Sequence, residues 1–200
     1  MLRRKSNILM AALFVTAGFI AGCSDNDDNN GNGGVTGNVD NNGQTLAQII
    51  QDDDDLSIFK DAVERAGLME QLQNNGQYTV FAPTNEAFNL RYPSEEQLDA
   101  LMDDSAALRD LLLYHMKYGR TESNALVGSS PIETRLPGTV IIADYVPGTQ
   151  EEGEEDEEPA QDIRLNYSPA RIVEPDINAK NGVIQKINRV LEIREGTSAE

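Results

Sequence analysis

The chain has 200 residues, of which 39% are hydrophobic and 25% are charged, and its formal net charge is −18. That length and composition suit one globular domain with additional segments, whereas the acidic surface would repel nucleic acid, so we expect no nucleic acid partner. The single cysteine and the single histidine exclude an internal disulfide, a Cys/His zinc site and a Cys/His nucleophile pair. We expect neither a cofactor nor a resident metal.

Residues 1–22 have the pattern of a bacterial lipoprotein signal peptide. Residues 3–5 are basic, and the apolar run from Ile8 to Ile20 is too short to span a bilayer. The run leads into Ala-Gly-Cys, which resembles a lipobox, so we expect Cys23 to be lipidated and to anchor the protein in the membrane. The alternative is an ordinary signal peptide followed by a chance cysteine. Ser24 favours the outer membrane or cell surface if the host has two membranes, and the anchor predicts a location in the cell envelope, facing outside the cytoplasm.

Residues 23–43 are predicted to be a tether between the anchor and the folded domain. Asn, Gly and Asp dominate this stretch, and Val35 and Val39 are its aliphatic residues, so it cannot bury a core. The spacing of an EF-hand loop begins at Asn26 but places Gly37 where calcium requires a bidentate glutamate. Calcium binding by the tether is therefore not expected.

Two short amphipathic helices are predicted at the start of the domain. Leu46, Ile49 and Ile50 share one helical face. A second apolar face repeats from Leu56 to Ala66, after which a glycine ends the helix.

An abrupt change from strand to helix follows these helices. Tyr78 to Ala82 has the pattern of a strand, which a proline stops, and either Thr84 or Asn85 can cap the short helix that carries Phe88. We expect Phe81 and Phe88 both to turn inward and to hold the strand against the helix.

The rest of the domain is predicted to contain two more helices and then several strands. Ser94 begins a capping box for one helix, and another runs from about Ser105 to Met116. The predicted strands, separated by turn residues, are Thr139 to Ala143, Ile163 to Asn166, Arg171 to Glu174, and Val183 to Ile193. Helices first and strands later predict an α+β domain over residues 44–194, followed by a tail over residues 195–200.

Two segments among these strands depart from a simple pattern. The closing strand alternates poorly, which predicts either a bend near Asn188 or burial on both faces. Residues 150–159 form an acidic loop between two strands, in which Glu151 to Glu158 is almost entirely acidic. We interpret the loop as a tolerated hairpin insertion; the alternative is a loose site for a divalent cation or a basic partner.

His115 is the obvious catalytic candidate, but its position favours the core. It follows Leu108, Leu111 and Leu112 at helical spacing and so falls on a buried apolar stripe. No Gly-x-Ser-x-Gly elbow is present to supply a nucleophile. We therefore expect a core histidine and no enzymatic activity.

Three ordered stretches resemble the motifs of the fasciclin (FAS1) domain family: YTVFAPTNEAF, LLLYHMKYGR and NGVIQKINRVLEI. The resemblance extends from about Thr45 to Ile193. It implies a wedge of short β-strands flanked by several α-helices, in an extracytoplasmic protein that mediates adhesion or matrix contact and performs no known chemistry. The positions that match the family motifs, with the structural roles that the resemblance implies, are Thr84, Asn85, Phe88, Tyr114, His115, Asn181 and Gly182.

The resemblance also points to one adhesion candidate and to two departures from the family. Asp176 and Ile177 occupy the family position at which an Asp-Ile pair has been credited with cell adhesion. The alternative is structural, with the aspartate serving a turn and the isoleucine the core. Gln185 stands where the family usually has histidine, and Asn188 where it usually has aspartate, so any polar network that joins those positions is expected to be neutral.

Three functional hypotheses follow from these patterns. The first is a non-catalytic, lipid-anchored adhesion or interaction module that binds a matrix, a cell-surface protein or a polysaccharide. The second is a calcium-responsive structural protein of the envelope that uses the acidic loop and the tether. The third is a hydrolase that uses His115, against which the missing nucleophile motif already weighs. The oligomeric state is left open.

Overall fold

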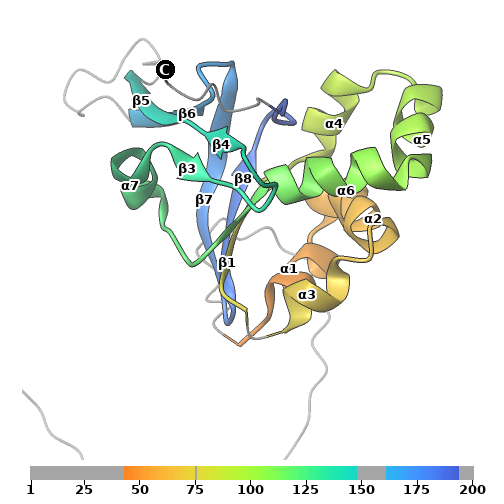
Figure 1. Cartoon of the computed structure of the whole chain (residues 1–200), viewed down its shortest axis with the longest axis horizontal. Helices are drawn as coiled ribbons and strands as arrows, with labels where there is room; N and C mark the ends of the chain where they lie inside the picture. Colours follow the sequence, from red (N-terminus) through yellow and green to blue (C-terminus); the bar gives the residue numbers. More distant parts are fainter. Residues whose placement is uncertain (1–42, 75, 148–160, 194–200) are drawn as a thin grey trace, which may run out of the picture. The chain divides into compact units, whose positions relative to one another are not determined.

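The computed structural model describes residues 43–74, 76–147 and 161–193 (Figure 1). The predicted signal peptide, the predicted lipidation site Cys23, all of the predicted tether except its last residue, and the acidic loop predicted at 150–159 lie outside these residues, as does the predicted tail. Among the helices that the structure describes, none is both long and apolar enough to cross a bilayer.

The helices occupy mainly the first half of the domain, and side chains cap several of them. Thr45 and Gln48 form a capping box, while Thr84, Ser94 and Asp104 each accept a hydrogen bond from an early backbone amide of the helix that follows. The described helices are α1 (Leu46–Asp52), η1 (Asp54–Leu56), α2 (Ser57–Arg65), α3 (Met69–Gln73), α4 (Asn85–Arg91), α5 (Glu95–Asp103), α6 (Ser105–Tyr114), α7 (Ser123–Leu126) and η2 (Val127–Ser129).

The strands form a mixed sheet with the order β2-β1-β8-β7-β6-β5, and β3 pairs with β4 separately. β1 and β8 run parallel, and the other neighbouring strands run antiparallel. The expected α+β class is therefore confirmed. The strand bounds are β1 (Tyr78–Pro83), β2 (Met116–Tyr118), β3 (Ile132–Glu133), β4 (Val140–Ile141), β5 (Ala143–Pro147), β6 (Gln161–Leu165), β7 (Ala170–Ala179) and β8 (Gly182–Ile187).

Two apolar clusters pack against the central strands. One contains Val80 and Ala82 of β1 together with side chains of helices α1, α2, α4 and α6; the other contains Phe81 and side chains of α7, β3 and β4. Figure 1 shows α1 to α6 on one side of β1 and β8, and α7 with β3 and β4 on the other. Every residue of β8 is buried, which confirms the predicted burial on both faces.

The strand-to-helix junction differs from its prediction in one respect. Phe81 and Phe88 are both buried, as expected. However, they belong to different clusters, Phe88 to the cluster with α1 and α2 and Phe81 to the cluster with α7. Because side chains alternate along a strand, the neighbours Val80 and Ala82 face the cluster that holds Phe88, and Phe81 faces away.

Several predicted element bounds are wrong. The closing strand ends at Ile187 instead of Ile193, because the backbone amide of Asn188 donates to Arg171 O and its side-chain oxygen accepts from Arg171 N. β7 extends to Ala179, well past the predicted Glu174, because register shifts on either side of Glu174 let a long strand bend and stay paired with β8. The short elements α3, α7, β2 and β3 were not predicted.

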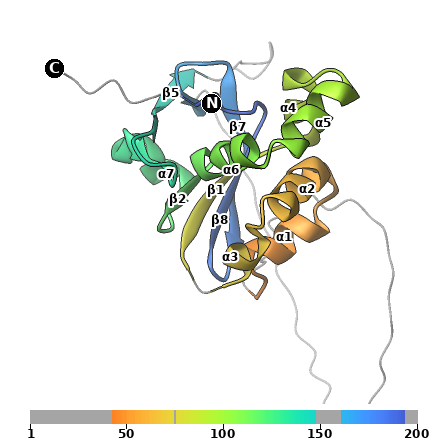
Figure 2. The same ribbon diagram turned by 45° about the vertical axis from the view of Figure 1, so that its right-hand side comes forward.

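Asn181 lies in the turn between β7 and β8, and Gly182 begins β8, beside the start of β1. A Cβ atom at Gly182 would lie 2.1 Å from Tyr78 O and 2.8 Å from Leu46 Cδ1. The register places Tyr78 directly opposite Gly182. Glycine is therefore required here by the close approach of two parallel backbones and a helix, and Figure 2 shows α1 and α3 beside this end of the sheet.

We expect Gly182→Ala to lower the free energy of unfolding by about 3 kcal/mol or more, because the backbone of β1 cannot move away without losing the ladder. Urea denaturation followed by circular dichroism measures the change. The control is Gly128→Ala in η2, where an added Cβ would meet nothing within 4 Å and a change of about 0.5 kcal/mol is expected. Equal stabilities of the two variants would contradict this account.

Candidate functional site

The predicted strand-to-helix elbow joins two helices. Thr84 Oγ1 accepts a hydrogen bond from Ala87 N at 3.3 Å and caps α4. Asn85 has a different partner, since its Oδ1 accepts from Ile58 N at 3.0 Å and its Nδ2 donates to Asp54 O at 2.8 Å. Asn85 therefore holds the start of α2 against the start of α4. The sequence left open which of the two side chains caps α4, and the structure assigns that role to Thr84.

Asn181 connects three elements that are distant in the sequence. Its Oδ1 accepts from Leu46 N at 2.8 Å, and its Nδ2 donates to Leu72 O and Asn74 O, both at 2.7 Å. Its carbonyl oxygen accepts from Tyr78 N at 3.2 Å. The side chain is 1% exposed, so removing it would leave buried backbone groups without partners.

Tyr114 and His115 end α6 and connect it to the rest of the domain. The Tyr114 hydroxyl donates to Val140 O at 3.0 Å and accepts from Asn166 Nδ2 at 2.9 Å. His115 Nδ1 lies 2.7 Å from Leu111 O, and its Nε2 accepts from Leu191 N at 2.9 Å. These contacts define a neutral imidazole with its proton on Nδ1.

Burial lowers the pKa of His115 to about 4, against the smaller opposing effect of the hydrogen bond to Leu111 O. The ring is 1% exposed, and both of its nitrogens are engaged by the backbone. A general base must reach the proton that it removes, so the position of His115 gives the hydrolase hypothesis no support. The burial predicted from the leucine stripe is observed.

Asp176 lies at a bend in β7 and holds α7 in place. Its φ is 59°, a left-handed conformation that aspartate tolerates better than most residues. Its carboxylate accepts from Ser123 N at 2.8 Å, Ser123 Oγ at 2.6 Å and Gln185 Nε2 at 2.7 Å. Because α7 has no side-chain cap from its own N-cap residue, Glu122, Asp176 supplies one from a distant strand.

Gln185 and Asn188 make separate contacts in place of one shared network. Gln185 Oε1 accepts from Asp176 N at 3.0 Å while its Nε2 donates to the Asp176 carboxylate. Asn188 instead accepts from Arg171 N at 2.8 Å. The two amide side chains therefore bond at two places on β7 and share no network, and the expectation of neutral bonds is wrong at Gln185, whose Nε2 donates to a carboxylate.

The bend in β7 creates an exposed surface next to Asp176. β6 pairs with β7 only through Ala170 and Arg171, whereas β8 remains paired with β7 as far as Ala179. The stretch 172–178 therefore has one ladder partner among the described strands. Val173 is 53% exposed, and Glu174 and Pro175 are also exposed. We call residues 173–177 the β7 bend.

Glu174 of the β7 bend forms an ion pair with Lys186 of β8 that the sequence did not predict. Lys186 Nζ lies 2.7 Å from Asp53 Oδ2 and 2.8 Å from Glu174 Oε2. Desolvation alone would lower the pKa of Lys186, but the hydrogen bonds to Asp53 and Glu174 outweigh it and raise the pKa. Lys186 is 6% exposed, so its charge fixes Glu174 to β8 and to the loop before η1.

Ile177, the second residue of the predicted adhesion pair, is half-buried. It pairs with Ile184 across the ladder and packs against the cluster of α1 and α2. Within the described residues no group of three or more His, Cys, Asp or Glu side chains could hold a metal ion. The acidic loop, on which the calcium hypothesis depends, lies outside those residues.

Taken together, the motif residues define an α+β scaffold domain in which polar side chains join helices to a mixed sheet. The chain belongs to the fasciclin domain family, whose model matches residues 54–193. A FAS1 domain pair from the insect cell adhesion molecule fasciclin I shares the fold, with a TM-score of 0.58 and 21% identity over 74% of this chain and 51% of that chain. The fold predicted from the three motifs is confirmed.

Relatives occur in animals and in cyanobacteria. The chain is 33% identical over 157 residues to pig (Sus scrofa) transforming growth factor-beta-induced protein ig-h3, covering 78% of this chain and 20% of that protein. It is 30% identical over 150 residues to human periostin, covering 74% and 16%. An uncharacterized protein of Synechocystis is 28% identical over 146 residues, covering 73% and 96%. The chain therefore spans about a fifth of the animal relatives and most of the length of the cyanobacterial one.

Protonation of His115 is expected to destabilise the domain in mild acid. The unfolded imidazole takes up a proton near its ordinary pKa of 6.5, whereas the folded one stays neutral down to about 4. The stability that the neutral ring contributes is thus complete above pH 6.5 and is lost as the pH falls toward 4, by about 3 kcal/mol in all.

Urea denaturation at several pH values between 7 and 4 measures this loss. His115→Gln is the comparison, because it has no group that titrates in this range while the carboxylates stay the same. The wild type should lose more stability than the variant over the interval. Parallel pH profiles for the two proteins would contradict the assignment.

Proposed function

We propose that the protein is a non-catalytic, lipid-anchored adhesion or interaction module that binds a matrix, a cell-surface protein or a polysaccharide outside the cytoplasm. The observation that carries the proposal is the fasciclin family match over residues 54–193. The fold shared with a pair of domains from an insect cell adhesion molecule supports the same function. A rigid scaffold with its histidine sealed in the core suits binding better than chemistry.

The β7 bend is the surface that we propose for the contact. It combines an exposed apolar side chain, Val173, with Glu174 and Pro175, and Asp176 holds this backbone in a fixed, bent conformation. A preorganised surface loses little conformational entropy on binding. The role of Asp176 would then be to position the bend, while Val173 would contact the partner directly.

The anchor and the tether are proposed from the sequence. A lipid on Cys23 would hold the protein in the cell envelope, and the stretch up to residue 43 would let the domain reach a partner beyond the membrane surface. If the host has two membranes, Ser24 favours the outer membrane or the cell surface.

Val173→Ser tests the binding surface. The side chain is 53% exposed, so its replacement should leave the melting temperature nearly unchanged. Attachment of cells or matrix to the immobilised protein should fall by about tenfold, as expected when one central apolar contact is lost. Asp176→Ala should also reduce attachment, together with the melting temperature, because Ser123 and Gln185 lose their acceptor.

Asp99→Ala on α5 is the matched control, since Asp99 is exposed and lies on a helix outside the bend. It removes the same charge as Asp176→Ala and should leave attachment as in the wild type. If folded Val173→Ser and Asp176→Ala proteins both attach as well as the control, the bend is not the contact surface.

Cys23→Ser tests the anchor. The variant should move from the membrane fraction to the soluble fraction and should fail to incorporate radiolabelled palmitate, because serine offers no thiol for the lipid. Ser24→Ala is the control and should remain in the membrane fraction. A Cys23→Ser protein that still sediments with membranes would refute the lipid anchor while leaving the adhesion surface untouched.

A further inference from the structure

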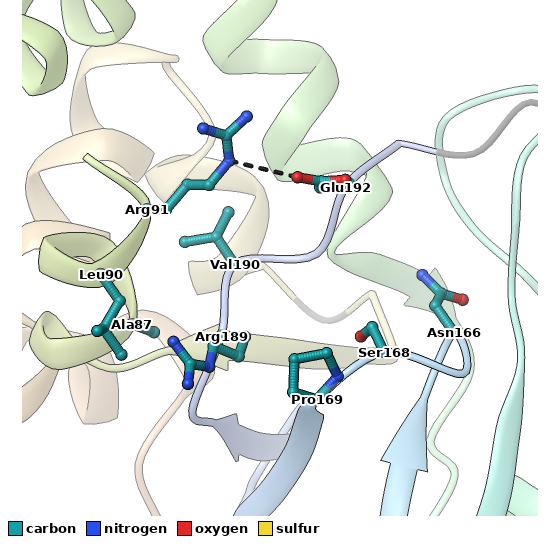
Figure 3. Close-up of a pocket in the computed structure, with 9 residues that line it drawn as sticks. All are labelled: Ala87, Leu90, Arg91, Asn166, Ser168, Pro169, Arg189, Val190 and Glu192. Atoms are coloured by element: carbon teal, nitrogen blue, oxygen red, sulfur yellow. Dashed lines mark ion pairs between the residues drawn. The ribbon is translucent and has the colours of Figure 1, made fainter. Parts of the chain in front are cut away.

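A pocket of about 230 Å³ is lined by residues outside the β7 bend. It opens between the C-terminal part of α4, the turn from β6 to β7, and the segment that follows β8 (Figure 3). Ala87, Leu90, Pro169 and Val190 supply apolar lining. Val190 is 8% exposed and Leu90 is 58% exposed. The apolar lining therefore extends from the buried core to the solvent-exposed surface.

Arg189 brings an unpaired cation into this pocket. Figure 3 shows its side chain among Ala87, Leu90 and Pro169. Its Nε atom is buried and has no hydrogen-bond partner. Among the arginines that the structure describes, every other one has a hydrogen bond, ion pair or ring contact, and Arg189 has none.

An unsatisfied, partly buried guanidinium requires an explanation. A buried donor without a partner costs free energy, and this chain carries 34 acidic residues against 16 basic ones, so acidic side chains are plentiful. None of the described carboxylates reaches Arg189. An anionic ligand would provide the missing acceptor and would replace the lost hydration.

Each of the other polar residues of the pocket has at least one partner within the protein. Asn166 donates to the Tyr114 hydroxyl and accepts from Ile142 N. Ser168 donates to Leu165 O and accepts from Ala170 N. Arg91 Nε lies 3.6 Å from Glu192 Oε1, as the dashed line in Figure 3 marks. The guanidinium of Arg189 is therefore the polar group of this lining that lacks a protein partner.

We propose that this pocket binds a small organic monocarboxylate with an apolar body, such as a short aliphatic or aromatic acid. The planar fork of a guanidinium matches the two oxygens of a carboxylate, and the apolar walls would take up the body of the acid. The net charge of −18 works against a polyanion, so a ligand with a single negative charge is selected. A sugar would find few free partners for its hydroxyl groups among side chains that are already hydrogen-bonded.

The carboxylate can come from a free small acid or from the end of a longer molecule. In both cases the carboxylate would contact Arg189 in the same way. A free small acid would end inside the pocket, whereas a longer molecule would extend past Leu90 into the solvent. This site does not depend on adhesion, because it involves α4 and residues 189–192 and leaves the β7 bend aside. An experiment that refutes the adhesion surface would therefore not refute the carboxylate site, and the reverse also holds.

Titration of the purified protein with benzoate and hexanoate tests the proposal, with benzamide and hexanamide as neutral counterparts of the same shape. Nuclear magnetic resonance of the arginine Nε–H groups reports directly on the contact. We expect both acids to shift the Arg189 resonance with a Kd on the order of 1 mM. The amides should bind at least tenfold more weakly, because they carry no charge.

Variants locate the contact. Arg189→Gln should weaken binding of both acids at least tenfold, whereas Arg65→Gln on α2, which removes an equal charge from an exposed side chain outside the pocket, should change the Kd less than twofold. Melting temperatures confirm that both variants are folded. Equal binding of acids and amides, or an unchanged Kd in folded Arg189→Gln, would overturn the proposal.

Dodecanoate, used below its micelle-forming concentration, separates the two sources. If it shifts the Arg189 resonance with an affinity no lower than that of hexanoate, the body of the ligand extends through the mouth and the carboxylate belongs to a longer molecule. If it binds at least tenfold more weakly, the ligand is a free small acid. Failure of all three acids to shift the resonance refutes the site.

Discussion

The parallel pairing of β1 with β8 is the constraint on which the rest of the domain depends. It brings together the first and the last of the described strands inside the sheet, next to the edge strand β2. Parallel neighbours require a long crossover, and here nearly the whole domain serves as that crossover. Asn181 secures the arrangement at one end, where its side chain joins α1 and α3 and its carbonyl oxygen accepts from the first residue of β1. Gly182 makes the approach of the two backbones possible.

Three polar residues join further elements of the domain to one another, each by a hydrogen bond between segments that are distant in the sequence. Asn85 holds the start of α2 from the start of α4, and His115 joins the end of α6 to Leu191. Asp176 caps α7 from β7. Asn85 and Asp176 supply from distant segments the caps that α2 and α7 lack at their own N-cap residues, and His115 attaches α6 to the segment after β8. Helix formation and tertiary packing therefore depend on each other. Such mutual dependence favours cooperative folding.

The sequence predicts those features of this fold that depend on local chemistry. The apolar spacing at Leu46, Ile49 and Ile50 predicted α1, Ser94 predicted the start of α5, and the pair of possible caps Thr84 and Asn85 predicted the start of α4 to within one residue. The three motifs then predicted the family and hence a fold of short β-strands flanked by helices.

Features that depend on contacts between distant segments escaped prediction. The length of β7 depends on bends that leave no distinctive residue pattern, and the end of β8 depends on a hydrogen bond between Asn188 and Arg171. In the candidate site, too, the sequence identified a residue but not its distant contacts. Asp176 was identified by its motif, but its partner Ser123 lies 53 positions away in the chain. The lack of an acidic partner for Arg189 is a property of the folded surface, which no reading of neighbouring residues reveals.

The attachment of both ends of the domain to β8 determines how the molecule carries mechanical load. At one end, Lys180 N donates to Gln44 O at 2.7 Å, and Asn181 holds Leu46, so the chain enters the domain beside the start of β8. At the other end, residues 188–191 follow β8 directly and stay attached to the domain, since the buried Leu191 donates its backbone amide to His115 Nε2. A pull between the entry and the exit is therefore transmitted along one buried strand. The ladder bonds on both of its sides would resist this force together, in shear, instead of opening one after another.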